Sequence, residues 1–439
     1  MKVLIIDQMG CLHLDFALRC MDAGHKVKVF CPKRKDGGRY STGDGLTDRV
    51  NDWEAWMKWA DLVFICDNTR YIYKMDEYHK KGFPIFAGNY AASQWELKRS
   101  LGDEMFKRAG IKTMECTSFT KYDDAIKYVM ETNKRYASKP DGDADKALSY
   151  CAKTPADLIY MLEKWKKSNK LKDGFILQEF KAGIEMAVGG WFGTDGFSKN
   201  FLENWEYKKL MNDDLGVATG EQGTILRYVQ ESKLADMVLK PLEGMLHGID
   251  YLGYVDVNCI ITEDGTPWPL EFTMRPGWPL FQIQQALHKG DPCEWMCDLM
   301  NGKDTLKVSD DIACGVVLSI PDYPYNKLQP EDYQGFPIYG VERDDLKNIH
   351  LSEAKWGNAP AMVDGAVGRR DLFVTSGNYV LTASGTSSTV DGAREKAYKL
   401  LDKIEVPNSP MWRTDIGKKL EKQIPKLKAM GFAKGMNYK

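Results

Sequence analysis

The sequence has no long hydrophobic run, no marked excess of one charge and no paired cysteine spacing. Its apolar runs stay short of the ~18 residues that a membrane-spanning helix needs. The 60 basic and 62 acidic residues give a net charge of −2, which does not indicate binding to nucleic acid or to a membrane surface. The 10 cysteines are scattered, mostly within apolar runs, as is typical of a reduced protein. We therefore expect a cytoplasmic protein, monomeric or homodimeric, that acts on small molecules.

Repeats, low-complexity segments and a signal peptide are also lacking. The first residues, MKVLII, run directly into Asp7 and predict a first strand. Cys293 and Cys297 are four residues apart on a predicted helix, but no histidine or second cysteine pair accompanies them, so we expect no metal site there. A chain of 439 residues is long enough for two or three domains with substantial cores.

What is present is a hairpin with polar residues in register. In VDVNCIITEDGTPWPLEFTMRPG (residues 255–277), Asp264-Gly265 predicts a two-residue type I′ turn. That turn places Asp256 opposite Thr273 and Asn258 opposite Glu271. Because side chains alternate between the faces of a strand, all four lie on one face and the apolar residues between them lie on the other.

Two carboxylates, an amide and a hydroxyl on one patch suit a hard cation. Mg²⁺ prefers oxygen ligands and commonly sits between carboxylates and substrate phosphates. Like charges as close as those of Asp256 and Glu271 are unfavourable unless a cation lies between them. The alternative is a hairpin whose outer face is simply polar and solvated.

The order of the predicted elements indicates an α/β and α+β multidomain protein. Strands over 2–6, 26–31, 62–66 and 84–87, with helices between them, predict a small doubly wound parallel sheet. Short strands and helices follow to about residue 180, and then a larger mixed sheet in which 230–247 and 281–301 are predicted helices. From residue 310 the sequence is mostly β, and its last 20 residues are predicted to be a helical, solvated surface appendage.

Several motifs resemble the phosphoribosylamine–glycine ligase family of the ATP-grasp superfamily, in order along the chain. They are MKVLIID at the start, AGIKTMECTSFT, ASKPDG, ILQEFKAGIE, EYKKLMNDDLGVATGEQG, LEFTMRPGWP and GVVLSIPDYP. The resemblance implies a pre-ATP-grasp domain over 1–95, an ATP-grasp domain over 96–305 with a lid subdomain at about 112–180, and a C-terminal domain with a helical tail over 306–439.

The resemblance also implies roles for individual residues. Lys139 would contact the α- and β-phosphates of ATP, and either Lys98 or Arg99 would face the phosphates. Arg275 and Lys208 would act on the reacting groups, with Arg275 holding a carboxylate or acyl phosphate. The adenosine would be bound by the hinge and its neighbours, Gln178, Glu179, Phe180, Glu185 and Leu270. Asp256, Glu271, Thr273 and Asn258 would hold Mg²⁺ or Mn²⁺.

The sequence departs from the family in four places. The family's first loop is glycine-rich with Arg-Glu-His, but here it is DQMGCLHLDFA, which keeps only Gly10 and His13. The family's Gly-Pro-Glu-Ala-Pro segment is CDNTRYI here, and its glycine-rich lid turn is GDADKALSY, where Lys146 is the candidate phosphate contact. Thr273 stands where the family has asparagine.

We therefore expect an ATP-dependent, ADP-forming ligase that activates a carboxylate, as of glycine, and joins it to an amine. The step belongs to purine biosynthesis if the amine is phosphoribosylamine. The altered loops also leave open a different amine or amino acid substrate, or a non-catalytic ATP-binding module.

Overall fold

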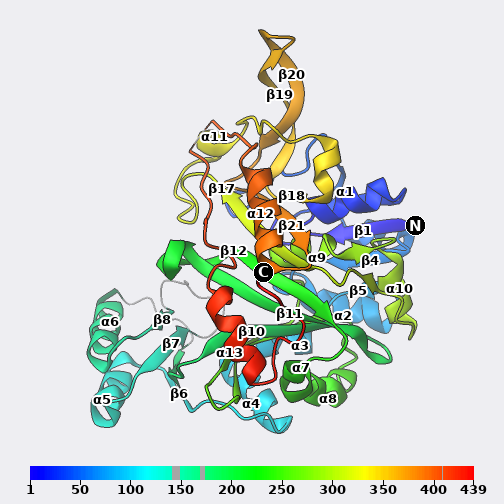
Figure 1. The fold of residues 1–439 in the computed structure, drawn as a ribbon. Helices are drawn as coiled ribbons and strands as arrows, with labels where there is room; N and C mark the ends of the chain where they lie inside the picture. The colour runs from blue at the N-terminus through cyan, green and yellow to red at the C-terminus, as the bar shows by residue number, and fades with distance from the viewer. Residues whose placement is uncertain (141–148, 169–173, 408) are drawn as a thin grey trace.

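A parallel sheet with helices on both faces forms the N-terminal part of the computed structural model, which describes residues 1–140, 149–168, 174–407 and 409–439 (Figure 1). Its strands, in the spatial order β3-β2-β1-β4-β5, are β1 (Lys2–Ile6), β2 (Lys26–Phe30), β3 (Asp48–Val50), β4 (Leu62–Ile65) and β5 (Ile85–Phe86). Helix α1 (Leu14–Asp22) packs on one face, while α2 (Ile72–Lys80) and the 3₁₀ helix η1 (Glu54–Trp59) pack on the other. The predicted doubly wound sheet is confirmed.

The order of these strands reverses between β1 and β4. The chain runs outward from β1 to β2 and β3, and then returns to β4 and β5. In open α/β sheets such a switch point, at the carboxyl ends of the strands, is where ligands bind. The segments that begin at Asp7 and Cys66 leave the sheet at this point.

A second, four-stranded antiparallel sheet has a core of its own. Its strands, in the order β6-β9-β7-β8, are β6 (Cys116–Phe119), β7 (Tyr136–Pro140), β8 (Tyr150–Cys151) and β9 (Phe175–Glu179). Helices α5 (Tyr122–Thr132) and α6 (Pro155–Ser168) contribute Val129, Leu158 and Leu162 to that core. We call residues 113–180 the lid segment.

The largest sheet has eight strands, in the order β14-β13-β10-β11-β12-β17-β21-β18. They are β10 (Ile184–Gly193), β11 (Gly196–Met211), β12 (Leu215–Val229), β13 (Gly253–Ile261), β14 (Pro267–Thr273), β17 (Ile312–Ser319), β18 (Ile349–Leu351) and β21 (Tyr379–Ser387). The sheet takes strands from both sides of the predicted boundary at residue 305. The division into domains therefore stays a prediction, and the backbone ladder is continuous across this boundary.

Apolar residues cover both faces of this large sheet. On one face, Val188, Val257 and Phe272 belong to the largest core. The helices that share this core are α3 (Tyr90–Leu97), α4 (Arg99–Arg108), α7 (Lys233–Val238), α8 (Glu243–His247), α12 (Val390–Leu401) and α13 (Leu420–Ala429). On the other face, Trp191 and Tyr254 pack with α9 (Leu280–Gln285), α10 (Glu294–Met300) and the N-terminal sheet. The polar residues of the hairpin lie on this second face.

Two long helices predicted from the sequence are interrupted. Residues 230–247 form α7, the 3₁₀ helix η4 (Lys240–Leu242) and α8, because Pro241 lacks the N–H that a continuous helix requires. Residues 281–301 form α9 and α10 with β15 (His288–Lys289) between them, where Gly290 adopts a positive φ of 86°. β15 pairs with β16 (Lys307–Val308).

The C-terminal tail is not a solvated appendage, and that prediction is wrong. Leu420, Ile424 and Leu427 of α13 are buried in the largest core, together with Phe432 and Met436 after it. The lysines that suggested solvation lie on the opposite side of the helix.

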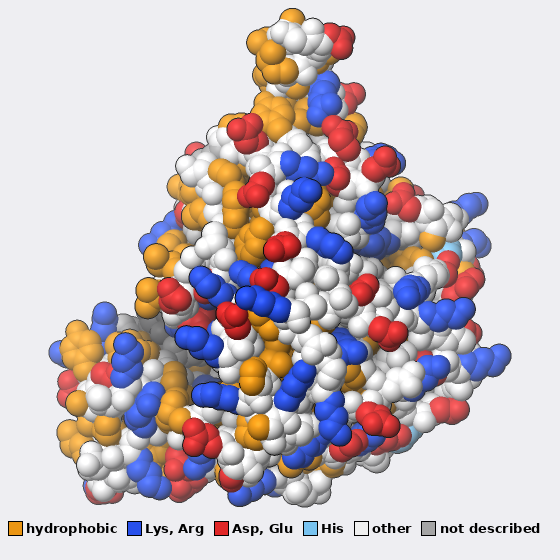
Figure 2. All heavy atoms as spheres, in the orientation of Figure 1, with side chains coloured by type: hydrophobic (Ala, Val, Ile, Leu, Met, Phe, Trp, Pro, Cys, Tyr) orange, Lys and Arg blue, Asp and Glu red, His pale blue; other side chains and the backbone are white. Residues whose placement is uncertain are grey.

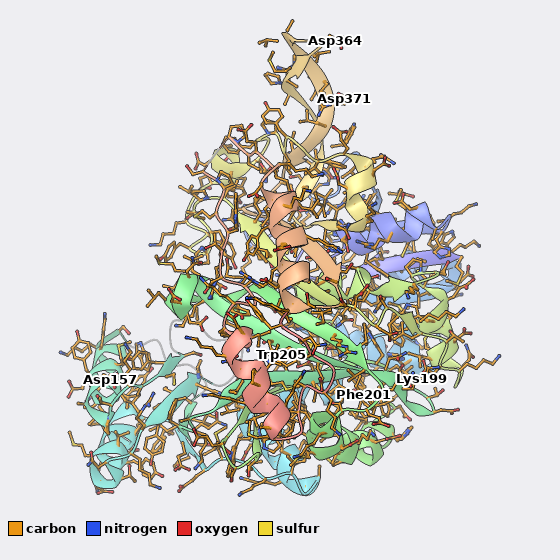
Figure 3. All side chains as sticks on the ribbon, viewed as in Figure 1. Asp157, Lys199, Phe201, Trp205, Asp364 and Asp371 are labelled. Carbon is orange, nitrogen blue, oxygen red and sulfur yellow. The ribbon has the colours of Figure 1, made fainter. Side chains whose placement is uncertain are left out.

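A two-stranded arm projects from the C-terminal region (Figure 1). It consists of β19 (Ala354–Val363) and β20 (Ala366–Thr375), with Asp364 at its tip and Asp371 on its stem (Figure 3). The remaining short helices are α11 (Pro330–Tyr333), η3 (Asn212–Asp214) and η5 (Arg343–Lys347). Basic and acidic side chains are interspersed on the face shown in Figure 2. None of the described helices is both long and apolar enough to cross a membrane.

Candidate active site

The hairpin of β13 and β14 has the predicted register where its polar residues lie. Asp256 pairs with Thr273 and Asn258 with Glu271. Closer to the turn the prediction is wrong by one residue, since Cys259 pairs with Pro269 and not with Leu270. The turn is also longer than two residues, because the Thr262 N–H donates to the Thr266 carbonyl at 3.1 Å. The carboxylate of Asp264 accepts hydrogen bonds from both threonine hydroxyls and so stabilises the wider turn.

The longer turn and a β-bulge at Leu270 compensate each other. Leu270 is the extra residue of β14 between the two registers, and a bulged residue is left outside the regular ladder. Its carbonyl accepts a hydrogen bond from Lys139 Nζ at 3.3 Å. Lys139 comes from β7 of the lid segment, so this bond joins the two sheets at the site. Burial, and then the charge of Arg99, lower the pKa of Lys139 to about 8.

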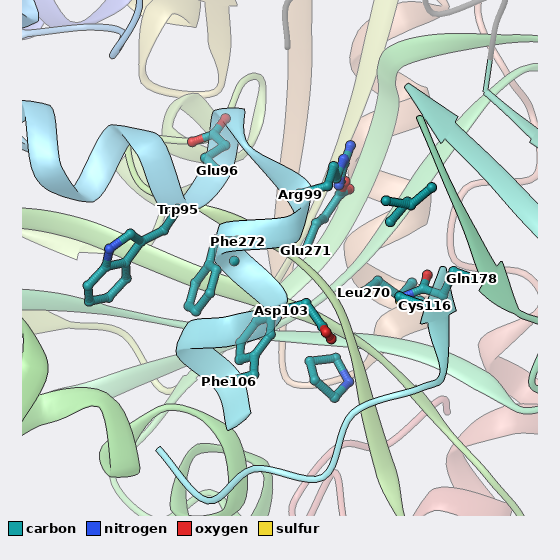
Figure 4. A pocket seen from close by; sticks show the side chains of 13 residues that line it. Trp95, Glu96, Arg99, Asp103, Phe106, Cys116, Gln178, Leu270, Glu271 and Phe272 are labelled. Carbon is teal, nitrogen blue, oxygen red and sulfur yellow. The ribbon is translucent and has the colours of Figure 1, made fainter. Parts of the chain in front are cut away.

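Glu271 is the acidic centre of the site. It forms ion pairs with Arg99 at the start of α4 and with Lys208 Nζ, at 3.2 Å from Oε1. Burial opposes its charge, but Arg99, Lys208 and Lys139 together hold the pKa of Glu271 well below its usual range. The sequence left Lys98 and Arg99 as alternatives, and the structure places Arg99 at Glu271 and leaves Lys98 exposed. Figure 4 shows the two side chains, Arg99 and Glu271, pointing toward each other.

Lys208 lies among three carboxylates. Its Nζ is 2.9 Å from Glu206 Oε2, 3.2 Å from Glu271 Oε1 and 3.7 Å from Glu185 Oε1. The amide of Asn258 donates to Glu185 at 2.8 Å and to Glu206 at 3.2 Å. Glu206 was missed by sequence reasoning. Its signal was the alternation of Asn204, Glu206 and Lys208 along β11, which puts three polar side chains on one face.

Asp256 is almost completely buried beside this network. Its Oδ2 accepts hydrogen bonds from Asn204 Nδ2 at 2.9 Å and from the Tyr254 hydroxyl at 3.0 Å. Burial, and then the charge of Glu206, raise the pKa of Asp256 to about 7. Gly189, on the neighbouring strand β10, makes room for this arrangement, because a Cβ there would lie 2.0 Å from the Tyr254 hydroxyl.

The residues of this face fit a divalent cation by their chemistry. Asn258 Oδ1 is buried without a hydrogen-bond partner in the described structure, and the mutual repulsion of Asp256 and Glu206 indicates too little positive charge between them. In the absence of ligand, Lys208 and Arg99 neutralise Glu271. Thr273 lies at the register position opposite Asp256. The side chains of Asp256, Glu206, Glu271, Asn258 and Thr273 offer the oxygen ligands that Mg²⁺ prefers.

Two other groups of metal-ligating side chains converge within 4.8 Å in the described residues. They are Asp7–His13–Cys31 and His25–Asp291–Cys293, so the expectation that no histidine accompanies Cys293 is wrong. His25 and Asp291 form an ion pair at 2.8 Å, and Asp291 also accepts the N–H of Cys293 at 2.8 Å. These bonds explain why His25, Asp291 and Cys293 lie close together without a metal ion.

The predicted hinge residues, Gln178 to Phe180, lie at the end of β9 in the lid segment. The N–H of Glu179 donates to the Glu115 carbonyl at 2.9 Å and that of Phe180 to the Arg135 carbonyl at 3.0 Å. The Arg135 guanidinium stacks 3.5 Å from the Phe180 ring centre. Gln178 and Leu270 line one side of a pocket whose other side is formed by Trp95, Arg99 and Phe272 (Figure 4).

Arg275 joins the large sheet to the N-terminal part. Its Nε lies 3.2 Å from Asp67 Oδ1, after β4, and 3.2 Å from Glu96 Oε1 on α3. Glu96 also accepts the Met274 N–H at 2.7 Å, which fixes the chain leaving the hairpin. Lys146, the predicted lid lysine, lies outside the described residues.

Residues 98–279 match the family model described as the phosphoribosylglycinamide synthetase ATP-grasp (A) domain. Over 357 residues the chain is 27% identical to the phosphoribosylamine–glycine ligase of Ralstonia nicotianae, covering 78% of this chain and 80% of that protein. The phosphoribosylamine–glycine ligase of Streptococcus suis is 24% identical over 441 residues, covering 96% of this chain and 100% of that protein.

Over residues 98–279 the chain is similar to the ATP-grasp domain of the phosphoribosylamine–glycine ligases.

Solved structures of ATP-grasp enzymes share this fold. Phosphoribosylamine–glycine ligase of Thermotoga maritima has a TM-score of 0.71 at 21% identity, covering 95% of this chain and 100% of that chain. N5-carboxyaminoimidazole ribonucleotide synthetase of the same organism has a TM-score of 0.57 at 16% identity, covering 93% of this chain and 99% of that chain. In this structure the face that bears Asp256 and Glu271 meets Lys139 of the lid segment at the Leu270 carbonyl.

Proposed function

We propose that this protein is an ATP- and Mg²⁺-dependent, ADP-forming ligase that joins the carboxylate of glycine to an amine. The observation that carries the proposal is the meeting of Lys139, Arg99 and Lys208 with Glu271, Asp256 and Asn258 between two sheets. Three cations beside a cluster of oxygen ligands suit a triphosphate and its metal. The relatives' names supply glycine as the acid substrate.

In the first step, a glycine carboxylate oxygen attacks the γ-phosphorus of ATP, and ADP leaves. Lys139 and Arg99 would hold the phosphates in line for the transfer. Lys208 would exchange its ion pairs with Glu185, Glu206 and Glu271 for a contact with the negatively charged phosphoryl group as it is transferred. Asp256, Glu271, Asn258 and Glu206 would hold Mg²⁺, which supplies charge neutralisation at the phosphate oxygens. Positioning and electrostatic stabilisation account for most of the catalysis expected here.

In the second step, the amine nitrogen attacks the carbonyl carbon of the acyl phosphate. The C–N bond forms, inorganic phosphate leaves and the nitrogen loses a proton. Arg275, which is held in place by Asp67 and Glu96, would orient the acyl phosphate. If the amine is phosphoribosylamine, the product belongs to purine biosynthesis, as in the named relatives.

The test is ADP release on adding ATP, Mg²⁺, glycine and an amine to the purified protein. Glu271→Gln should lower the rate at least about a hundredfold, because it loses the charge that organises Arg99, Lys208 and the metal. Glu342→Gln is the matched control, since Glu342 is also paired with an arginine, Arg370 at 3.1 Å, but lies on the surface near the arm. Full activity of Glu271→Gln at limiting Mg²⁺ would contradict the metal assignment. A nucleotide-induced melting shift without ADP from any acid and amine would instead indicate a binding module.

A further inference from the structure

The first loop, at the switch point of the N-terminal sheet, is already occupied by an anion from the chain itself. The carboxylate of Asp7 accepts the N–H groups of Met9, Gly10, Leu12 and His13 at 2.7–3.0 Å. It also contacts His13 Nδ1 at 2.7 Å. Successive backbone amides ahead of a helix are the groups that bind phosphate in glycine-rich loops. Here those amides are satisfied by Asp7, so they are not available to a phosphorylated substrate.

Beside this loop lie two buried side-chain amides, of Gln8 and Asn68, whose oxygens can still accept hydrogen bonds. Gln8 Nε2 donates to the Asp67 carbonyl at 2.5 Å, and Asn68 Nδ2 donates to Glu96 at 2.8 Å. Both partners are acceptors, which fixes the orientation of the two amides. Gln8 Oε1 and Asn68 Oδ1 then have no hydrogen-bond partner among the described residues, although the side chains are 1% and 2% exposed.

Glu221 adds a third acceptor of the same kind. It is 4% exposed, and its Oε1 has no partner within the described parts of the chain. The ladder between β11 and β12 passes from Tyr207–Gly223 to Lys209–Ala218, so residues 219–222 lie opposite Lys208 and outside the regular pairing. Burial, then the charges of Glu206 and Asp256, raise the pKa of Glu221, while Arg275 and Lys208 lower it. Glu221 is therefore close enough to Lys208 and Arg275 for their charges to act on its carboxyl group.

The charge around these acceptors is negative. Asp67 and Glu96 share the single guanidinium of Arg275, and Glu221 is not bonded to it. Burial, and then the charge of Glu353, raises the pKa of Cys11 in the first loop, and the charges of Glu353 and Glu221 add to burial in raising the pKa of Tyr323. Arg34 is paired with Asp36 at 2.6 Å and Arg39 with Asp44 at 2.8 Å. A phosphate placed beside Gln8 and Asn68 would face carboxylates.

We propose that the amine substrate is unphosphorylated and positively charged, and that Gln8, Asn68 and Glu221 accept its N–H groups. This inference rests on the proposed ligase function and specifies its second substrate. Its basis is the filled anion loop together with the buried, unpartnered oxygens of Gln8 and Asn68 at the strand ends where ligands bind, and of Glu221 within β12. A buried acceptor without a partner is unfavourable, and a donor-rich amine satisfies all three.

The first experiment compares ethanolamine with O-phosphoethanolamine, which differ only in a phosphate, and adds 1,4-diaminobutane as an amine with two positive charges. Each is titrated calorimetrically into the protein saturated with ADP and Mg²⁺. We expect diaminobutane to bind most tightly, and O-phosphoethanolamine at least about tenfold more weakly than ethanolamine. Tighter binding of the phosphorylated amine, or binding of none of the three, would overturn the proposal.

Paired variants locate the effect. Glu221→Gln keeps the shape of the side chain but cannot become a carboxylate when a cationic amine binds, so it should weaken diaminobutane binding at least about tenfold. Glu203→Gln is the control, because Glu203 is equally buried with one unpaired oxygen, Oε2, but lies on the opposite face of the same sheet. Equal binding by Glu221→Gln and wild type would overturn the role of Glu221.

A gain of function tests the filled loop. In Asp7→Gly the loop amides lose their internal anion, so inorganic phosphate in the presence of ADP and Mg²⁺ should raise the melting temperature of this variant more than that of wild type. An equal shift in both proteins would overturn the loop argument. Amine binding without ADP release would overturn the proposed function and leave this inference intact. Efficient turnover of phosphoribosylamine, with no binding of the unphosphorylated amines, would support the proposed function and overturn this inference.

Discussion

Lys139 is the residue whose protonation bears most directly on nucleotide binding. Its pKa is lowered to about 8, first by burial and then by Arg99, so its positive charge is present below that pH and is lost above it. ADP affinity should therefore fall by about tenfold between pH 7 and pH 9.5. Calorimetric titrations at the two pH values measure this change.

Lys139→Arg is the informative variant for this pH dependence. An arginine keeps its charge over the whole range, so the variant should bind ADP with little change between pH 7 and pH 9.5. A wild-type affinity that stays constant over this range would show that Lys139 is fully protonated throughout or does not contact the phosphates.

Most residues of the site could be predicted individually, but their partners could not. Lys139, Lys208, Asp256 and Glu271 come together as expected from the hairpin and the family motifs. Glu206 and Glu221 were not expected, because their roles depend on which strands become neighbours of β13. Strand order joins residues some 50 positions apart, and neither periodicity nor local turn chemistry carries that information.

At the scale of the element, strand β10 can pack against the Asp256 side of the site because residue 189 is a glycine. A Cβ at Gly189 would lie 2.0 Å from the Tyr254 hydroxyl and 2.7 Å from Asp256 Oδ2. Gly189→Ala should therefore displace the Asp256 carboxylate and lower the Mg²⁺-dependent affinity for ADP by about tenfold. Calorimetry with and without Mg²⁺ separates this effect from a general loss of stability.

Gly244 in helix α8 provides the matched control. Nothing lies within 4 Å of a Cβ at this position, and alanine is a better helix former than glycine. Gly244→Ala should leave ADP binding unchanged and stabilise the fold by up to about 1 kcal/mol. Unchanged Mg²⁺-dependent binding in Gly189→Ala would contradict the fit of β10 against Asp256.

The elements show why sequence patterns succeeded in some places and failed in others. The alternation over residues 256–258 and 271–273 gave the correct face, because burial of the apolar side fixes the register. The prediction of a two-residue turn was wrong because the hydroxyls of Thr262 and Thr266 donate to Asp264 and stabilise a longer turn. The Asp-Gly pair alone does not indicate these bonds. The prediction for the tail was wrong because its lysines, which indicate a solvated segment, are interspersed with apolar residues that pack into the core, such as Leu420, Ile424 and Leu427.

For the whole molecule, the eight-stranded sheet predicts that the C-terminal third does not fold alone. β17 pairs with β12 from Gly223–Val316 to Arg227–Ile312, and α13 packs in the core shared with α3 and α7. A fragment of residues 306–439 would expose this strand edge and these apolar side chains. We expect it to lack a cooperative thermal transition by circular dichroism, and to gain one when coexpressed with residues 1–305. A cooperative transition in the isolated fragment would contradict this.

The same continuous ladder bears on how genes for such chains can be rearranged. The lid segment has its own sheet and core, so a recombination event near residues 113 and 180 would exchange a self-contained insert. A breakpoint at residue 305 would instead join strands that had not been selected as neighbours. Recombination between related genes should therefore yield folded proteins most often when it exchanges the lid segment and keeps the rest of the chain from one parent.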